Sequence, residues 1–240
     1  MSNFKQKFER LEQKYLLTAM QLASLRSTVD QHFVPNAYGE SRICNIYYDT
    51  PDFRLIRQSI DKPEYKEKLR LRTYGVPRPD STAFAEIKKK YRGVVYKRRI
   101  SMSYAEALAY LGGAAPAPEP SQISNEIDWM FRVYPGLRPA MMIAYDRTVL
   151  FSRDDPELRV TFDKNITWRT DMPDLAAGTD GSRLLPDGLC LMELKLPGAM
   201  PLWLSHRLDE LGIYPVSFSK YGEAYTEMTG GHRHPAVLIA

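Results

Sequence analysis

Charged side chains recur at every second position in several stretches of this chain, where the side chains of a buried strand would be apolar. Because side chains alternate between the two faces of a β-strand, charges spaced by two residues share one face. Such faces are formed by Lys66, Lys68, Arg70 and Arg72, by Glu86, Lys88 and Lys90, and by Glu193 and Lys195. A closed sheet of such strands would enclose a wet, mostly cationic interior with a few carboxylates, which suits a polyanion and a metal ion.

The strand cations match the requirements of a phosphate chain, whose oxygens point in every direction. Such a ligand needs donors from several walls, and arginine offers a planar fork where lysine offers a point charge. The candidates are Lys68, Arg70, Arg72, Lys88, either Lys97 or Arg98, Arg147 and Arg159. A single basic strand face would more simply be the solvated side of a half-buried sheet. Recurrence on most strands favours a wet interior.

Three carboxylates each precede a lysine by two residues, which places both side chains on one strand face. The pairs are Glu12 with Lys14, Glu86 with Lys88, and Glu193 with Lys195. Hard divalent cations such as Mg²⁺ or Mn²⁺ take one or two carboxylates together with substrate phosphates. One Glu-x-Lys unit alone is most simply an ion pair. Three units on different strands favour a site for metal-assisted phosphoryl transfer.

Several other chemistries lack their motifs. The chain has no glycine-rich phosphate loop, no Gly-x-Ser-x-Gly, no His-Glu-x-x-His and no dinucleotide fingerprint, so side chains would have to hold any nucleotide by its phosphates. Cys44 and Cys190 are expected to be small buried hydrophobes. His232 and His234 lie in a glycine-rich end and predict no metal site.

Composition indicates a folded protein, with 44% hydrophobic and 26% charged residues and a net charge of only +4. No signal-peptide core and no apolar run of transmembrane length is present, so we expect a cytoplasmic protein with no membrane segment. Nucleic-acid binding is disfavoured because cations inside a narrow lumen cannot reach a duplex backbone.

The local patterns predict an α+β protein. Strands are expected at residues 8–17, 42–49, 65–73, 82–92, 94–102, 139–152, 158–168 and 189–196. Helices are expected after a Thr18 capping box, at 53–59 as a short helix or turn, at 104–111, from Ser121 or Ser124 to about 134, at 201–211 and at 219–228. We therefore expect an eight-stranded antiparallel β-barrel with flanking helices. It would form one domain over 1–240, with a core at about 8–227 and a flexible tail at 229–240.

A set of short runs, in a fixed order, carries a family resemblance. The runs are 12–16, 45–50, 68–75, 86–88, 96–99, 145–147, 158–163, 192–195 and 217–221. Together they resemble the VTC domain, the polyphosphate polymerase domain of vacuolar transporter chaperone complexes and their bacterial relatives. That domain belongs to the triphosphate tunnel metalloenzyme (CYTH-like) superfamily. The resemblance implies a basic eight-stranded tunnel, metal-dependent chemistry on triphosphates, and synthesis of polyphosphate from ATP.

The resemblance also implies residue roles. The phosphate-gripping candidates are Lys14, Arg70, Arg72, Lys88, Lys97, Arg147 and Arg159, to which Arg98 and Lys195 are added from their strands. Tyr145 would help to position the substrate. Glu193 would hold Mn²⁺ or Mg²⁺, with Glu12 and Glu86 as further metal ligands or general bases. Lys220 would contact the phosphate being transferred or the growing chain.

One position departs from the superfamily. The tunnel superfamily opens with Glu-x-Glu-x-Lys, whereas this chain has Arg10 in place of the first carboxylate. Loss of a water-orienting carboxylate favours transfer over hydrolysis. The leading expectation is a polyphosphate polymerase that uses ATP. The alternatives are a tunnel hydrolase acting on tripolyphosphate or a nucleoside triphosphate, and a catalytically silent polyphosphate-binding module. Protein partners are not predicted.

Overall fold

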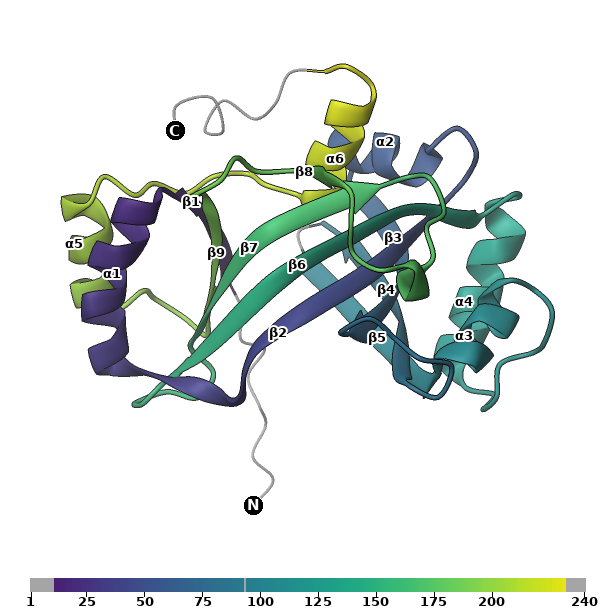
Figure 1. Ribbon diagram of the computed structural model, residues 1–240, viewed down its shortest axis with the longest axis horizontal. Coiled ribbons are helices and arrows are strands. Elements are labelled where there is room, and N and C mark those ends of the chain that lie inside the picture. The colour runs from purple at the N-terminus through teal and green to yellow at the C-terminus, as the bar shows by residue number, and fades with distance from the viewer. Residues whose placement is uncertain (1–10, 93, 232–240) are drawn as a thin grey trace.

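The computed structural model describes residues 11–92 and 94–231, which form an α+β fold with one large antiparallel sheet (Figure 1). The strands are β1 (Leu11–Leu17), β2 (Phe33–Asp49), β3 (Tyr65–Tyr74), β4 (Thr82–Tyr91), β5 (Val94–Ser103), β6 (Arg138–Ser152), β7 (Arg159–Arg169), β8 (Ser182–Arg183) and β9 (Cys190–Leu196). The helices are α1 (Ala19–His32), α2 (Arg54–Ile60), α3 (Tyr104–Leu111), α4 (Gln122–Val133), α5 (Leu202–Glu210) and α6 (Lys220–Met228), with a short 3₁₀ turn at Leu175–Ala177.

The strands pair in the order β1-β9-β7-β6-β2-β3-β4-β5, and β8 adds a short pair to β7. The expected antiparallel sheet is therefore confirmed, but the expected closed barrel is not. Within the part of the chain that the structure describes, no strand ladder joins β1 to β5. Part of the edge of β1 is already used, because Val216 donates its backbone N–H to the Lys14 carbonyl at 2.7 Å. The segment before α6 thus occupies a backbone carbonyl of β1 that would otherwise be free to pair with another strand and close the sheet into a barrel.

The strand expectations hold with one large difference. β2 begins at Phe33, well before the expected start at residue 42, and it runs through a proline, an asparagine and a glycine. Its pairing with β6 shifts register between Pro35 and Glu40, which accommodates these strand-breaking residues. Residues 8–10 of the expected first strand and Gly93 of the expected β4–β5 turn lie outside the described residues. Most of the expected 229–240 tail, including His232 and His234, also lies outside them.

Capping boxes fix the starts of three helices. The side chain of Thr18 accepts from the Gln21 N–H at the start of α1, and Ser103 and Ser121 cap α3 and α4 in the same way. These contacts confirm the expected capping box at Thr18 and select Ser121 as the cap of α4. The expected helices at 53–59, 201–211 and 219–228 are present as α2, α5 and α6.

Helices cover the apolar face of the sheet in two places and contact the opposite face in a third. α1 and α5 pack together at one end, and α3 and α4 lie at the other (Figure 1). Sheet residues such as Leu69, Leu71 and Val160 are fully buried beneath these two groups. Cys44 and Cys190 are buried among them as free thiols, as expected. α6 packs near α2 and contacts the other face of the sheet, which bears the charges described next.

Candidate active site

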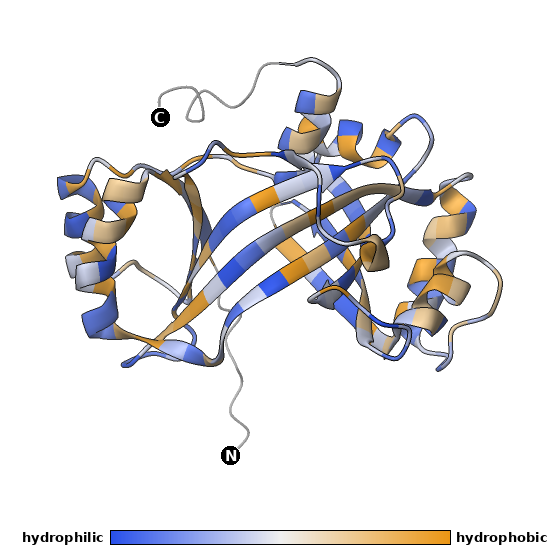
Figure 2. Ribbon diagram, in the orientation of Figure 1, coloured by the Kyte–Doolittle hydropathy of each residue, from blue (hydrophilic) through white to orange (hydrophobic). Residues whose placement is uncertain are grey.

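The strand register gathers the alternating charges on one face of the sheet, which we call the charged face. Its defining side chains are Glu12, Lys14, Arg70, Arg72, Glu86, Lys97, Arg147, Asp163, Glu193 and Lys195. Polar and apolar residues alternate along the strands in Figure 2. Side chains from strands that are not direct neighbours meet here: Arg147 of β6 reaches Glu193 of β9 across β7. Such convergence is expected where a sheet curls around its charged face.

Glu193 is the centre of one cluster on this face. Its side chain is 9% exposed, and one oxygen lies 3.2 Å from the Lys220 Nζ and 3.6 Å from the Lys14 Nζ. Its other oxygen lies 3.5 Å from an Arg147 nitrogen. Burial by itself would raise the pKa of Glu193, but Lys220, Lys14 and Arg147 outweigh it and hold the pKa well below its usual range. Glu193 is therefore an anion surrounded by cations from β1, β6 and α6.

Asp163 of β7 is a second carboxylate in this cluster, and it was not singled out from the sequence. It is fully buried and accepts two hydrogen bonds from Arg147, each 2.6 Å long. Its Oδ2 also lies 2.6 Å from the Lys220 Nζ. Burial would lower the pKa of Lys220, but Asp163 and Glu193 together raise it, so this lysine stays protonated at neutral pH. The contacts fix both cations in place.

Glu86 is the centre of a second cluster, on β3, β4 and β5. Its side chain is only 1% exposed and lies 2.6 Å from the Arg70 Nε and 2.9 Å from the Lys97 Nζ. An Arg72 nitrogen is 3.8 Å away. Burial opposes ionisation, but Arg70, Arg72 and Lys97 outweigh it and lower the pKa of Glu86 to about 2. Each cluster is thus a buried carboxylate held by several cations.

Tyr145 connects the two clusters. Its hydroxyl accepts a 3.3 Å hydrogen bond from Arg72, whose Nε also donates to the buried Asn45 at 2.9 Å. The Lys220 Nζ lies 4.6 Å from the centre of the Tyr145 ring, within cation–π range. Tyr145 sits where the β6–β7 register shifts between Ala144 and Asp146. Such bulges re-aim side chains.

Two lysines on the charged face have lowered pKa values. Lys68 donates to the Ser219 hydroxyl at 3.3 Å, and its burial lowers its pKa to about 8. Lys195 lies opposite Glu12 on β1 and Arg159 on β7. Burial, followed by the repulsion of Arg159, lowers the pKa of Lys195 to about 8. Both lysines therefore lose their charge at a lower pH than an ordinary lysine, and a bound anion would favour their charged form.

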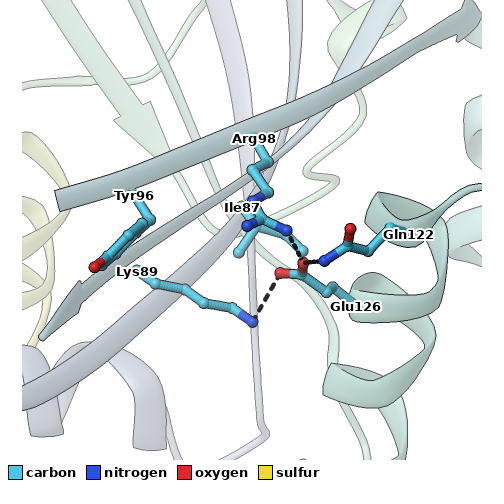
Figure 3. Close-up of a pocket in the computed structure, with 6 residues that line it drawn as sticks. All are labelled: Ile87, Lys89, Tyr96, Arg98, Gln122 and Glu126. Atoms are coloured by element: carbon cyan, nitrogen blue, oxygen red, sulfur yellow. Dashed lines mark hydrogen bonds and ion pairs between the residues drawn. The ribbon is translucent and has the colours of Figure 1, made fainter. Parts of the chain in front are cut away.

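The structure separates Arg98 from the other predicted phosphate-binding residues. Lys97 pairs with Lys88 across β4 and β5, so both share the charged face, while Arg98 projects from the opposite face. There Arg98 contacts Glu126 of α4, which also binds Lys89 (Figure 3). We therefore assign the position that the sequence left open to Lys97. A one-residue difference in register decides between the two.

α6 and the residues before it cover one end of the charged face. Lys14 donates to the Phe218 carbonyl at 2.8 Å, and the Tyr221 ring stacks on Tyr47 of β2 with centroids 4.4 Å apart. Phe218 and Tyr221 pack into an apolar cluster with residues of this face such as Leu191. This packing places Lys220, the first residue of α6, beside Glu193.

The residues around Glu193 fit a divalent cation better than those around Glu86. The ion pairs of Glu193 are 3.2 to 3.6 Å long, so its oxygens are held loosely. The adjacent Thr161 hydroxyl is buried and has no hydrogen-bond partner among the described residues. Glu86 is committed to short contacts with Arg70 and Lys97. Within residues 11–92 and 94–231, no group of three or more potential protein ligands could hold an ion unaided, so a substrate would have to supply further oxygens.

The fold and the site together define an antiparallel sheet that carries two carboxylate–cation clusters on one face. The VTC domain model matches residues 9–229, and the chain therefore belongs to the VTC domain family. This family assignment agrees with the resemblance seen in the sequence. No curated protein matches the chain significantly.

Solved structures support the fold. One neighbour, from Bacillus halodurans, is 16% identical, with a TM-score of 0.55 over 88% of this chain and 93% of its own. Another, from Hippeastrum, is 14% identical, with a TM-score of 0.51 over 93% of this chain and 97% of its own. Both are described as putative adenylate cyclases, and the Hippeastrum protein has a dominant triphosphatase activity. At these identities the similarity concerns the fold.

Among the described residues, no helix combines the length and the hydrophobicity that a membrane-spanning helix requires.

Proposed function

We propose that this protein is a metal-dependent polyphosphate polymerase that transfers the γ-phosphate of ATP to the end of a polyphosphate chain. The observation that carries the proposal is the Glu193 cluster, in which a buried carboxylate meets Lys14, Arg147 and Lys220 from three elements. Phosphoryl transfer depends mainly on positioning and charge neutralisation, which such a cluster supplies. Membership of the VTC domain family supports the choice of polyphosphate.

The proposed reaction is an in-line displacement. A terminal oxygen of the polyphosphate chain attacks the γ-phosphorus, the bond from that phosphorus to the β–γ bridging oxygen breaks, and ADP leaves with the electron pair. Lys220 neutralises charge on the phosphoryl group in transit, while Asp163 and Tyr145 hold Lys220 in place. Arg70, Arg72 and Lys97 bind the neighbouring phosphates, with Lys88, Arg159 and Lys195 extending the cationic surface.

Glu193 would hold Mn²⁺ or Mg²⁺, with Glu12 as a further candidate ligand beside Lys14. A divalent cation held by these residues would supply charge neutralisation for the phosphate groups. Glu86 acts as the counter-charge of Arg70, Arg72 and Lys97, and we no longer propose it as a metal ligand. Its short ion pairs keep it from the ion.

A second function is favoured by the position of α6. Because Phe218 and Tyr221 cover one end of the charged face, a long product has less room to pass through than a short substrate has to bind. That arrangement suits a hydrolase of tripolyphosphate or a nucleoside triphosphate. The triphosphatase activity of the Hippeastrum neighbour points the same way. The remaining alternative, a binding module without turnover, is opposed by the intact Glu193 and Lys220 pair.

The test uses purified full-length protein with Mn²⁺ or Mg²⁺. Acid-insoluble polyphosphate formed from ATP, together with equivalent ADP, supports the polymerase. Phosphate released from tripolyphosphate without polymer supports the hydrolase, and tight binding with neither product supports the binding module. Glu193→Ala should abolish metal-dependent turnover, and turnover that persists would refute the metal assignment. Lys220→Ala should abolish turnover while tripolyphosphate binding largely remains, and Glu126→Gln on the opposite face of the sheet is the matched control.

A further inference from the structure

Three flat side chains lie on the charged face next to the Glu86 cluster. Phe84 of β4 is the cross-strand partner of Arg72 on β3, and Tyr74 follows Arg72 by two residues. Phe84 and Tyr74 therefore share the face of Arg72. The rings of Tyr74 and Phe84 meet edge to face, with centroids 5.9 Å apart and an interplanar angle of 88°. The Arg99 guanidinium of β5 lies 4.7 Å from the centre of the Phe84 ring.

This aromatic cluster is open to solvent although it is built from bulky rings. Tyr74 is 56% exposed, Arg99 is exposed and Phe84 is half-buried. Phe84 is held on one side by Arg99 and on another by Tyr74, so its orientation is fixed without being covered. An exposed tyrosine ring and an exposed guanidinium both offer flat surfaces that stack with other flat groups.

The position of the cluster relates it to the phosphate-binding cations. Same-face neighbours on a strand are about 7 Å apart. Tyr74 is therefore about one such step from Arg72 and about two from Arg70. A ligand whose phosphates lie on Arg70 and Arg72 would bring a group linked to its last phosphate to the Tyr74 ring. In a nucleoside triphosphate, that group is the base, attached through the ribose.

We propose that Tyr74, Phe84 and Arg99 form a stacking platform for the base of a nucleoside triphosphate. This inference rests on the proposed function, because it assumes that triphosphates bind to the charged face. Base stacking on aromatic and guanidinium groups tolerates every nucleobase, because each has a π-face. The platform therefore distinguishes nucleoside triphosphates from inorganic tripolyphosphate and accepts both ATP and GTP.

The experiment measures dissociation constants of ATP, GTP and tripolyphosphate by calorimetry, for the wild-type protein, three platform variants and one control variant. Tyr74→Ala removes the exposed ring, Phe84→Leu keeps an apolar side chain without an aromatic plane, and Arg99→Lys keeps the charge without the guanidinium plane. Tyr96→Ala is the matched control, because Tyr96 is an exposed ring on the opposite face of β5. The ratio of the nucleotide constant to the tripolyphosphate constant cancels any general loss of folding.

Tyr74→Ala and Phe84→Leu should weaken ATP and GTP binding by about 5- to 150-fold, the range expected for loss of one stacked base. Tripolyphosphate binding should change less than twofold, and Tyr96→Ala should change neither. If nucleotides and tripolyphosphate weaken in parallel, or if no variant changes the ratio, the platform does not exist. If the wild-type protein binds tripolyphosphate but not nucleotides, this inference fails while the charged face remains a triphosphate site. Binding of none of the three ligands would overturn the proposed function as well.

Discussion

Replacing Glu86 by glutamine should destabilise the fold by an amount that depends on pH. Glutamine keeps the shape of the side chain but removes the charge that offsets Arg70, Arg72 and Lys97. In the folded protein those cations, acting against burial, lower the pKa of Glu86 from 4.5 to about 2. At 1.36 kcal/mol per pH unit, this corresponds to about 3 kcal/mol of stability at neutral pH.

The pH dependence of this stabilisation follows from the difference in pKa between the folded and unfolded states. A carboxyl whose pKa is lowered by folding binds its proton more readily in the unfolded chain. The contribution of Glu86 to the free energy of unfolding is therefore complete above pH 4.5 and disappears as the pH falls through 2. With the two pKa values above, roughly 1.4 kcal/mol remains at pH 3. The variant lacks this contribution at every pH. The difference in the free energy of unfolding between wild type and Glu86→Gln should therefore shrink by about half between pH 7 and pH 3.

Urea unfolding of both proteins at pH 7 and pH 3 measures this difference directly. Tripolyphosphate supplies a second measurement, because three cations without their carboxylate should bind it more tightly and regain stability in its presence. A difference that stays constant with pH would refute the reasoning, since it would show that Glu86 stabilises by packing and not by charge. Weaker tripolyphosphate binding by the variant would contradict the role of Glu86 as a counter-charge.

Three further predictions concern Asp163, Tyr221 and Lys68. Asp163→Asn leaves Lys220 and Arg147 without their shortest ion pairs and should lower the free energy of unfolding by about 3–5 kcal/mol in urea titrations. Tyr221→Phe removes the 2.8 Å hydrogen bond to the buried Asp49 and should cost about 1–3 kcal/mol, measured in the same way. Because the pKa of Lys68 is lowered to about 8, the affinity for tripolyphosphate should fall from pH 7 to pH 9, and Lys68→Arg should flatten that profile in calorimetry. An unchanged profile would exclude Lys68 from the binding site.

The alternation of charges predicted the charged face because side-chain direction along a strand is a local property. Parity alone placed Arg70 and Arg72 on one side and Leu69 and Leu71 on the other, as the structure has them. The choice between Lys97 and Arg98 could not be made in this way. It depends on how β5 pairs with β4, and two adjacent residues with similar charge give no signal of that register.

Asp163 shows a different limit. It ends the run Arg159, Thr161, Asp163, which shares one strand face, and this parity could have indicated the residue. Its importance comes from Lys220, which is distant in sequence and meets it only through the packing of α6. The open sheet was equally hidden, because the hydrogen bond from Val216 to the edge of β1 joins two segments that no local pattern relates.

The carboxylates on the charged face are counter-ions that are covalently part of the protein. Mobile ions around a cationic surface diffuse away when a ligand arrives, and their release favours binding. Glu86 and Asp163 are fixed to their strands, so a ligand that displaces them gains no such entropy and must compete with short, buried ion pairs. A single phosphate offers too few charges to replace several of these contacts at once. We therefore expect the face to prefer ligands that carry many charges within a short length.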